Sequence, residues 1–172
     1  MTPTLRVYTS EDVVGCEIGG ALKNVIAIAA GVADGLGYGT NTKAALITRG
    51  LAELARFGTA AGGQPLTFLG LSGNGDLVAT CSSPQSRNYR LGQELAQGRS
   101  AQEVLSTQSA VVEGAATAPV AIELAARLHV EVPIARSVVA LLRGERSAPE
   151  LVSQLMGREG KAEFAGLGNP KA

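Results

Sequence analysis

The sequence predicts an all-α fold, and three observations support this prediction. Apolar residues recur at helical spacing, glycines and prolines fall where helices would end or begin, and no strand-like segments alternate with the helices. The 172 residues suit one domain, and 45% hydrophobic with 17% charged residues is a composition that buries a core.

The first two predicted helices are rich in glycine. One runs over residues 11–36, and one stripe of it carries three glycines at which another helix can approach closely: Gly15, Gly19 and Gly20. The second begins at Asn41, which fits an N-cap, and ends at Gly58. On this helix Arg49 and Glu53 lie four residues apart, on the more polar side.

The following segment, residues 65–82, breaks the helical rhythm and is predicted to be a turn-rich insertion. Ser83 or Ser86 then begins a helix with Pro84 in its first turn, and the pattern leaves open which serine is the cap. Two capping boxes predict further helix starts, at Ser100 with Glu103 and at Ser147 with Glu150.

Two more helices are expected near residues 110–128 and 133–143, the last begun by Pro133 and stopped by Gly144. Together these elements predict a helical domain at residues 1–157, followed by a flexible tail at 158–172.

Composition excludes several classes of function. Fifteen basic and fifteen acidic residues cancel and aromatic residues are 3%, so a nucleic-acid surface is not expected. The longest uncharged apolar run, residues 25–33, is too short to span a bilayer, and no signal peptide opens the chain. Cys16 and Cys81 have neither metal-site nor disulfide spacing, which predicts no metal site and a reducing, cytoplasmic setting.

No glycine motif for nucleotide binding is complete in this sequence. Gly15 to Gly20 has the spacing of a phosphate-binding loop, but Ala21 stands where a lysine is needed. GLGYG and GLSGNG have the wrong order for a dinucleotide fingerprint and no strand before them. The sequence therefore predicts no nucleotide-binding domain within the chain.

Lys23 and Asn24 interrupt the apolar run GGALKNVIAIAAG. One interpretation is a lysine that extends to solvent at the helix edge. The other is a general acid or base, because an apolar wall disfavours the charged amine and so helps it release a proton. Asp76, after the turn residues GNG, is either an ordinary turn carboxylate or the charged partner of Lys23.

Arg87 and Asn88 lie in or near the first turn of a predicted helix. Free backbone N–H groups and a guanidinium together suit a phosphate, although a surface arginine is the simpler interpretation. Lys43 and Arg49 are interpreted as helix-surface charges, Cys81 as a buried small hydrophobic residue, and His129 as structural or exposed near a helix end.

Five segments, taken in order, resemble one known family: GGALKNVIAIAAG, NTKAALITRGLAEL, GLSGNGDLVATC, QSRNYRLG and VVEGAATA. They are similar to the carboxy-terminal domain of bacterial NAD(P)-dependent glycerol-3-phosphate dehydrogenase, over about residues 7–156. The resemblance implies a helical substrate domain like that of 6-phosphogluconate dehydrogenase. It also implies interconversion of sn-glycerol 3-phosphate and dihydroxyacetone phosphate with NAD or NADP, which supplies phospholipid biosynthesis.

The resemblance also implies roles for single residues. Lys23 matches the catalytic lysine, Asp76 an active-site aspartate, and Ser86, Arg87 and Asn88 the substrate-binding residues. Arg87 would also reach the cofactor, which Val111 and Glu113 would line, and Asn24 and Thr80 are taken as further substrate-site residues because they share these motifs. Asn74 departs from the pattern, which has an apolar residue there.

The family's amino-terminal Rossmann domain is not found in this sequence, so the chain is expected to be a fragment or one half of a split enzyme. It would need that domain, in cis or in trans, to bind the dinucleotide tightly and to be active, and a homodimer is a further expected state. Two alternatives stay open: a non-catalytic dimerisation or partner-binding module with a relic phosphate site, and a related dehydrogenase acting on hydroxy acids. The S-R-N segment disfavours the second, because a carboxylate substrate does not need a phosphate site.

Overall fold

The computed structural model describes residues 1–108 and 110–157. This part of the chain is helical, and its strand-like pairing is limited to one isolated bridge between Thr2 and Leu5. The elements, in chain order, are α1 (Val13–Gly35), α2 (Thr40–Ala60), α3 (Pro65–Leu69), the π-helical segment η1 (Leu71–Gly75), α4 (Asp76–Ser82), α5 (Arg87–Ala96), α6 (Ala101–Ser106), α7 (Glu113–Arg127), α8 (Pro133–Leu142) and α9 (Ala148–Met156). The all-α prediction is confirmed, while the predicted tail at 158–172 lies outside the described residues.

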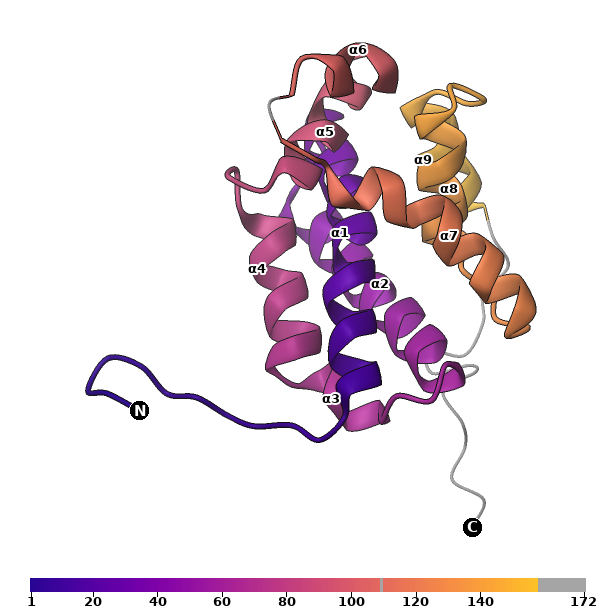
Figure 1. The fold of residues 1–172 in the computed structure, drawn as a ribbon. Coiled ribbons are helices and arrows are strands. Elements are labelled where there is room, and N and C mark those ends of the chain that lie inside the picture. The colour runs from indigo at the N-terminus through magenta and orange to yellow at the C-terminus, as the bar shows by residue number, and fades with distance from the viewer. Residues whose placement is uncertain (109, 158–172) are drawn as a thin grey trace.

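Helix α1 is the centre of the molecule, with α2, α4, α5, α7 and α8 packed around it (Figure 1). Its N-terminus is capped by Asp12, whose Oδ1 accepts a hydrogen bond from the Gly15 N–H at 2.9 Å. From Asn24 to Ala33 nearly every residue is buried, because neighbouring helices cover this part of α1 on several sides. The residues before α1 run away from the helices as an extended segment (Figure 1).

The composition of α1 follows from this central position. Among the described helices, it alone is long and apolar enough to cross a membrane by length and composition, with a mean hydropathy of 1.5 over the most apolar window. The uncharged apolar run of residues 25–33, which is too short to span a bilayer, is only one part of this helix. Half of the window is buried inside the protein, which is the pattern of a core helix.

Helices α1 and α5 cross at glycines. A Cβ atom added to Gly31 would lie 1.9 Å from the Tyr89 carbonyl oxygen, and one added to Gly92 would lie 2.0 Å from the Ile28 carbonyl oxygen. Only residues without a Cβ let two helix backbones approach this closely. The start of α5, with Arg87 and Asn88, is thereby placed directly against α1.

Several expected boundaries were wrong. Residues 65–82 are not a turn-rich insertion, because α3, η1 and α4 occupy almost all of them. Helix α2 begins at Thr40 with Gly39 as N-cap rather than Asn41, and it continues through Gly58 to Ala60. Gly58 is retained inside the helix because the Phe68 ring occupies the space of a side chain, with its Cζ 2.1 Å from an added Cβ.

Other helix starts agree with the sequence. Both capping boxes are present, Ser100 with Glu103 and Ser147 with Glu150. Ser86 rather than Ser83 caps α5, so Pro84 precedes the helix instead of standing in its first turn. The two capping boxes therefore predicted the starts of α6 and α9 correctly, whereas the cap of α5 had been left open and the placement of Pro84 was wrong.

Glu53 was expected on the polar side of α2, and this was wrong. It is buried, and its two carboxylate oxygens each accept a hydrogen bond, from the N–H groups of Ile134 and Ala135, at 2.9 Å. These are N–H groups of the first turn of α8, which lacks a side-chain cap of its own. Glu53 thus joins α2 to the C-terminal helices.

Candidate functional site

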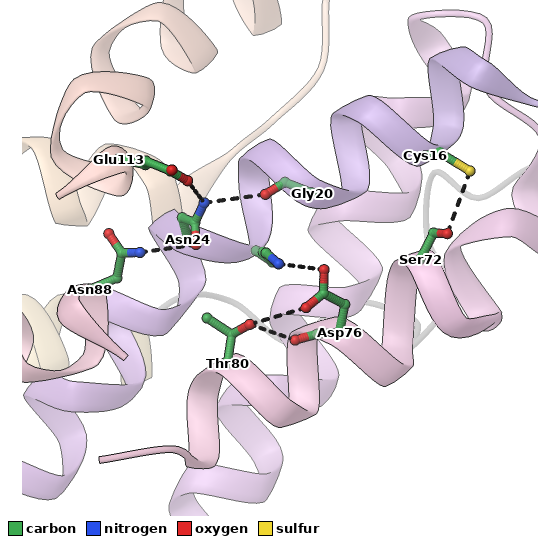
Figure 2. A network of polar contacts seen from close by, with 9 residues as sticks. Cys16, Gly20, Asn24, Ser72, Asp76, Thr80, Asn88 and Glu113 are labelled. Atoms are coloured by element: carbon green, nitrogen blue, oxygen red, sulfur yellow. Dashed lines mark hydrogen bonds and ion pairs between the residues drawn. The ribbon is translucent and has the colours of Figure 1, made fainter. Parts of the chain in front are cut away.

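Lys23 lies in the middle of α1, and its ammonium forms an ion pair with the carboxylate of Asp76, the first residue of α4. The two side chains are 20% and 39% exposed, so the pair borders solvent while α1 shields one side. The Thr80 hydroxyl donates to the Asp76 carbonyl oxygen at 2.7 Å and lies 3.4 Å from Asp76 Oδ1 (Figure 2). Of the two interpretations that the sequence left open for Asp76, the structure therefore shows the charged partner of Lys23.

The meeting of Lys23 with Asp76 depends on contacts one turn earlier in each helix. A Cβ on Gly19 would lie 2.5 Å from the Ser72 carbonyl oxygen, so the backbone of η1 touches α1 directly. The Cys16 thiol donates to the Ser72 hydroxyl at 3.5 Å on the same face (Figure 2). Single-turn π-helical segments are frequent beside functional sites, and here η1 leads straight into Asp76.

A second polar group joins α1, α5 and α7 (Figure 2). The Asn24 side-chain N–H groups donate to the Gly20 carbonyl oxygen at 3.2 Å and to Glu113 Oε2 at 2.9 Å. Its Oδ1 accepts from Asn88 Nδ2 at 2.9 Å, and Asn88 Oδ1 accepts from the Gly114 N–H at 2.8 Å. Because Lys23 precedes Asn24 and Arg87 precedes Asn88, this group adjoins both predicted charged site residues.

The start of α5 is set by Ser86, whose hydroxyl accepts from the Tyr89 N–H at 3.3 Å. Arg87 is the first residue of α5 and is partly buried. Within residues 1–108 and 110–157 its guanidinium makes no hydrogen bond or ion pair, which leaves its planar set of donors for a ligand.

Tyr89 links α5 to the far end of α1. Its hydroxyl donates to Asp34 Oδ2, and the same oxygen is paired with Lys43 Nζ at 2.8 Å. Burial alone would raise the pKa of Asp34, but the hydrogen bonds from Lys43 and Tyr89 and the lysine charge outweigh it, so the pKa is lowered. Burial, followed by the bond to Asp34, raises the pKa of Tyr89 to about 12. The prediction that Lys43 is a surface charge was therefore wrong, because a partly buried ion pair holds it.

The remaining predicted residues differ in their exposure to solvent. Val111 is 70% exposed just before α7, and Glu113 is exposed at the first position of that helix. His129 is exposed after α7, and Cys81 is fully buried, as expected. No group of three or more metal-ligating side chains occurs among the described residues.

A groove of about 1120 Å³ lies elsewhere, between α2, α8 and α9. It contains none of the predicted site residues, although Glu53 lines it. The polar side chains of Figure 2 thus lie around another part of α1 and not in this groove.

Sequence reasoning missed two residues that take part in the polar contacts of the site, Gly114 and Ser72. Gly114 directly follows Glu113 in VVEG, and this adjacency was the available signal. Ser72 meets α1 through its backbone oxygen and its hydroxyl, two contacts that no residue pattern reveals.

Residues that could hold a dinucleotide are found at the edge of this site. Arg87 and Glu113 each occupy the first position of a helix, and Val111 presents an apolar side chain to solvent nearby in the chain. A guanidinium and an exposed apolar contact fit the border of a cofactor, while no glycine-rich phosphate loop accompanies them in this chain.

The family model described as "NAD-dependent glycerol-3-phosphate dehydrogenase C-terminus" matches residues 12–153. The chain belongs to this family. The match covers α1 to most of α9 and so includes every polar group of Figure 2. The resemblance expected from the sequence is confirmed.

Relatives of known name agree with this family. The glycerol-3-phosphate dehydrogenase [NAD(P)+] of Geobacillus kaustophilus is 54% identical over 164 residues, 95% of this chain and 48% of its own length. That of Nitrosococcus oceani is 56% identical over 162 residues, 94% of this chain and 47% of its own length.

Solved structures show the same fold. Glycerol-3-phosphate dehydrogenase of Coxiella burnetii superimposes with a TM-score of 0.87 at 38% identity, covering 92% of this chain and 49% of that one. The Saccharomyces cerevisiae enzyme superimposes with a TM-score of 0.81 at 28% identity, covering 90% and 46%. This chain therefore spans about half the length of the relatives it matches.

Proposed function

We propose that this chain is the substrate-binding and catalytic half of an NAD(P)-dependent glycerol-3-phosphate dehydrogenase. It would interconvert sn-glycerol 3-phosphate and dihydroxyacetone phosphate together with a nucleotide-binding half. The observation that carries the proposal is the Lys23–Asp76 ion pair, found in a chain whose relatives bear that enzyme's name.

Lys23 is the proposed proton donor and acceptor. When dihydroxyacetone phosphate is reduced, negative charge develops on the carbonyl oxygen, and a nearby ammonium stabilises it and then donates a proton. In the reverse direction the neutral amine accepts the hydroxyl proton. A bound nicotinamide supplies or accepts the hydride.

Asp76 accepts a hydrogen bond from the ammonium and so holds it at one place beside α4.

Arg87 is the proposed phosphate ligand. It stands at the N-terminus of the ten-residue helix α5, where backbone N–H groups and the helix dipole favour an anion. Ser86 and Asn88 flank it in the chain, and Asn24 and Thr80 border the lysine pair. Holding the phosphate fixes the reacting carbon relative to Lys23, which is the benefit of two-point binding.

The cofactor is proposed to be NAD or NADP, bound mainly by the nucleotide-binding half, with Arg87, Val111 and Glu113 at its border. We also assign the enzyme to the cytoplasm, and the free thiols of Cys16 and Cys81 support a reducing compartment. The expected homodimer stays a prediction that sedimentation equilibrium tests. A relic module is not favoured, because Lys23 and Asp76 remain paired.

A fusion of this chain to the amino-terminal half of the Geobacillus kaustophilus relative tests the proposal. We expect the fusion to oxidise glycerol 3-phosphate and the 172-residue chain alone not to. Lys23→Met should lower kcat by about 100- to 10,000-fold with little change in KM, the range for a lost general acid. Arg87→Ala should chiefly raise KM for the phosphate substrate.

Fusion protein that is folded but inactive with both NAD and NADP would contradict the proposed function. If Lys23→Met raised KM and Arg87→Ala lowered kcat instead, the two roles would be the reverse of those proposed.

A further inference from the structure

Hydrogen bonds from three helices close a ring beside Lys23 and Arg87. The Gly114 N–H donates to Asn88, Asn88 donates to Asn24, and Asn24 donates to Glu113. Glu113 and Gly114 are consecutive, so the first turn of α7 bonds to both amides: the Glu113 carboxylate accepts from Asn24, and the Gly114 N–H donates to Asn88. Figure 2 shows three members of the ring: Asn88 on α5, Asn24 on α1 and Glu113 on α7.

The direction of every bond in the ring is dictated by its ends. A backbone N–H can only donate, so Asn88 must turn its oxygen toward Gly114 and its NH₂ toward Asn24. Asn24 must then present its oxygen to Asn88 and its NH₂ to the Gly20 carbonyl and the Glu113 carboxylate. A carbonyl oxygen and an ionised carboxylate can only accept hydrogen bonds. Both side-chain N–H groups of Asn24 are thereby used inside the protein.

The ring is mostly shielded from water, since Asn24 and Asn88 are 5% and 7% exposed. Gly114 is required there, because a Cβ would lie 2.6 Å from the Asn24 carbonyl oxygen and 2.7 Å from Asn88 Oδ1. Val112, the N-cap of α7, offers no side-chain hydrogen bond, so Asn88 supplies the cap from another helix. A buried polar ring of this kind allows one arrangement of its helices.

We infer that Glu113 and Gly114 are positioning residues of the substrate site, an inference that rests on the function proposed above. Through Asn24 and Asn88 they hold Lys23 on α1 and Arg87 on α5 at a fixed separation. Asn24 then acts on the substrate by position, since it has no N–H left to donate to a phosphate. Glu113 acts in the same way, whether or not a dinucleotide lies beside it.

Two substitutions of Glu113 test this inference in the ¹⁵N-labelled 172-residue chain. Glu113→Ala removes the acceptor, whereas Glu113→Gln keeps an oxygen that can accept from Asn24. Glu123→Ala, at another exposed glutamate of α7, is the matched control. NMR measures hydrogen exchange of the Asn24 and Asn88 side-chain amides and of the Gly114 N–H, and titration with millimolar glycerol 3-phosphate measures affinity.

We expect Glu113→Ala to speed exchange at all three groups and to weaken glycerol 3-phosphate binding about tenfold, as for a lost hydrogen bond to a charged group. Glu113→Gln should restore most of both, and Glu123→Ala should change neither. Unchanged exchange in Glu113→Ala would overturn the ring itself.

Faster exchange with unchanged affinity would overturn the positioning role, as would a Glu113→Gln variant as damaged as Glu113→Ala. If the unsubstituted chain bound no glycerol 3-phosphate, the proposed function would fail and the positioning role with it. The exchange data would still report whether the ring exists, so the two failures are distinguishable.

Discussion

Replacing Gly31 by alanine should force α1 and α5 apart. The added Cβ would lie 1.9 Å from the Tyr89 carbonyl oxygen and 3.1 Å from the Gly92 Cα. Both obstacles are backbone atoms, so no change of rotamer relieves the contact. The helices must separate by more than about 1 Å before the Cβ reaches an ordinary carbon–oxygen distance.

The cost follows from the packing around this crossing. Overpacking a well-filled core costs about 1–3 kcal/mol, and a backbone obstacle belongs at the upper end of that range. Alanine returns about 1 kcal/mol through its better helix propensity. We therefore expect a net loss of about 2 kcal/mol in the free energy of unfolding, or about 4–8 °C in Tm for a chain of this size.

Gly20→Ala provides a control on the same helix. An added Cβ there meets nothing within 4 Å, so only the helix-propensity gain should remain, raising stability by about 0.5–1 kcal/mol. Thermal and urea unfolding of the three chains measure both effects. If Gly31→Ala were as stable as Gly20→Ala, the close approach of α1 and α5 would be refuted.

Three further outcomes are expected. The pKa of Asp12 is lowered by hydrogen bonds from the Thr67 hydroxyl, then from backbone N–H groups. The ionised carboxylate therefore stabilises the folded chain above about pH 4, and this stabilisation is lost as the pH falls below that. In urea unfolding, Asp12→Asn should show a smaller loss of unfolding free energy at acid pH than the unsubstituted chain. Glu53→Ala leaves two buried N–H groups of α8 without their acceptor, so the unfolding free energy should fall by about 2–6 kcal/mol, and by less in Glu53→Gln. Burial raises the pKa of the Cys81 thiol to about 12, so mass spectrometry should find it unmodified by iodoacetamide in the folded chain and modified in guanidinium; equal rates would contradict its burial.

Contiguous patterns predicted the local features of the fold. The capping boxes at Ser100 and Ser147 need only four neighbouring residues, so a sequence shows them completely. Lys23 stood out because an ammonium interrupted an apolar run, and the structure pairs it with Asp76, one of the two roles that the sequence allowed for this carboxylate.

Features set by distant contacts were not predictable in this way. Glycine and turn residues in 65–82 suggested turns, but this segment is largely helical, and its π-helical part η1 packs against Gly19, far away in the chain. Glu53 looked polar and exposed because its partners, the N–H groups of α8, are more than 80 residues away in the chain. High glycine content predicted close approaches without distinguishing Gly19, which touches a neighbour, from Gly20, which does not.

Helix α1 explains how one short motif serves two polar groups. Successive residues of an α-helix are rotated by about 100°, so the neighbours Lys23 and Asn24 face different helices. Lys23 meets α4 through Asp76, while Asn24 meets α5 and α7 through Asn88 and Glu113. Since one helix carries both residues, a shift of α1 that breaks the amide ring would also move the Lys23 ammonium, the proton donor and acceptor of the proposed function. If Arg87 and Lys23 hold the two ends of the substrate as proposed, the adjacency of Lys23 and Asn24 in the sequence links the positions of these two ends.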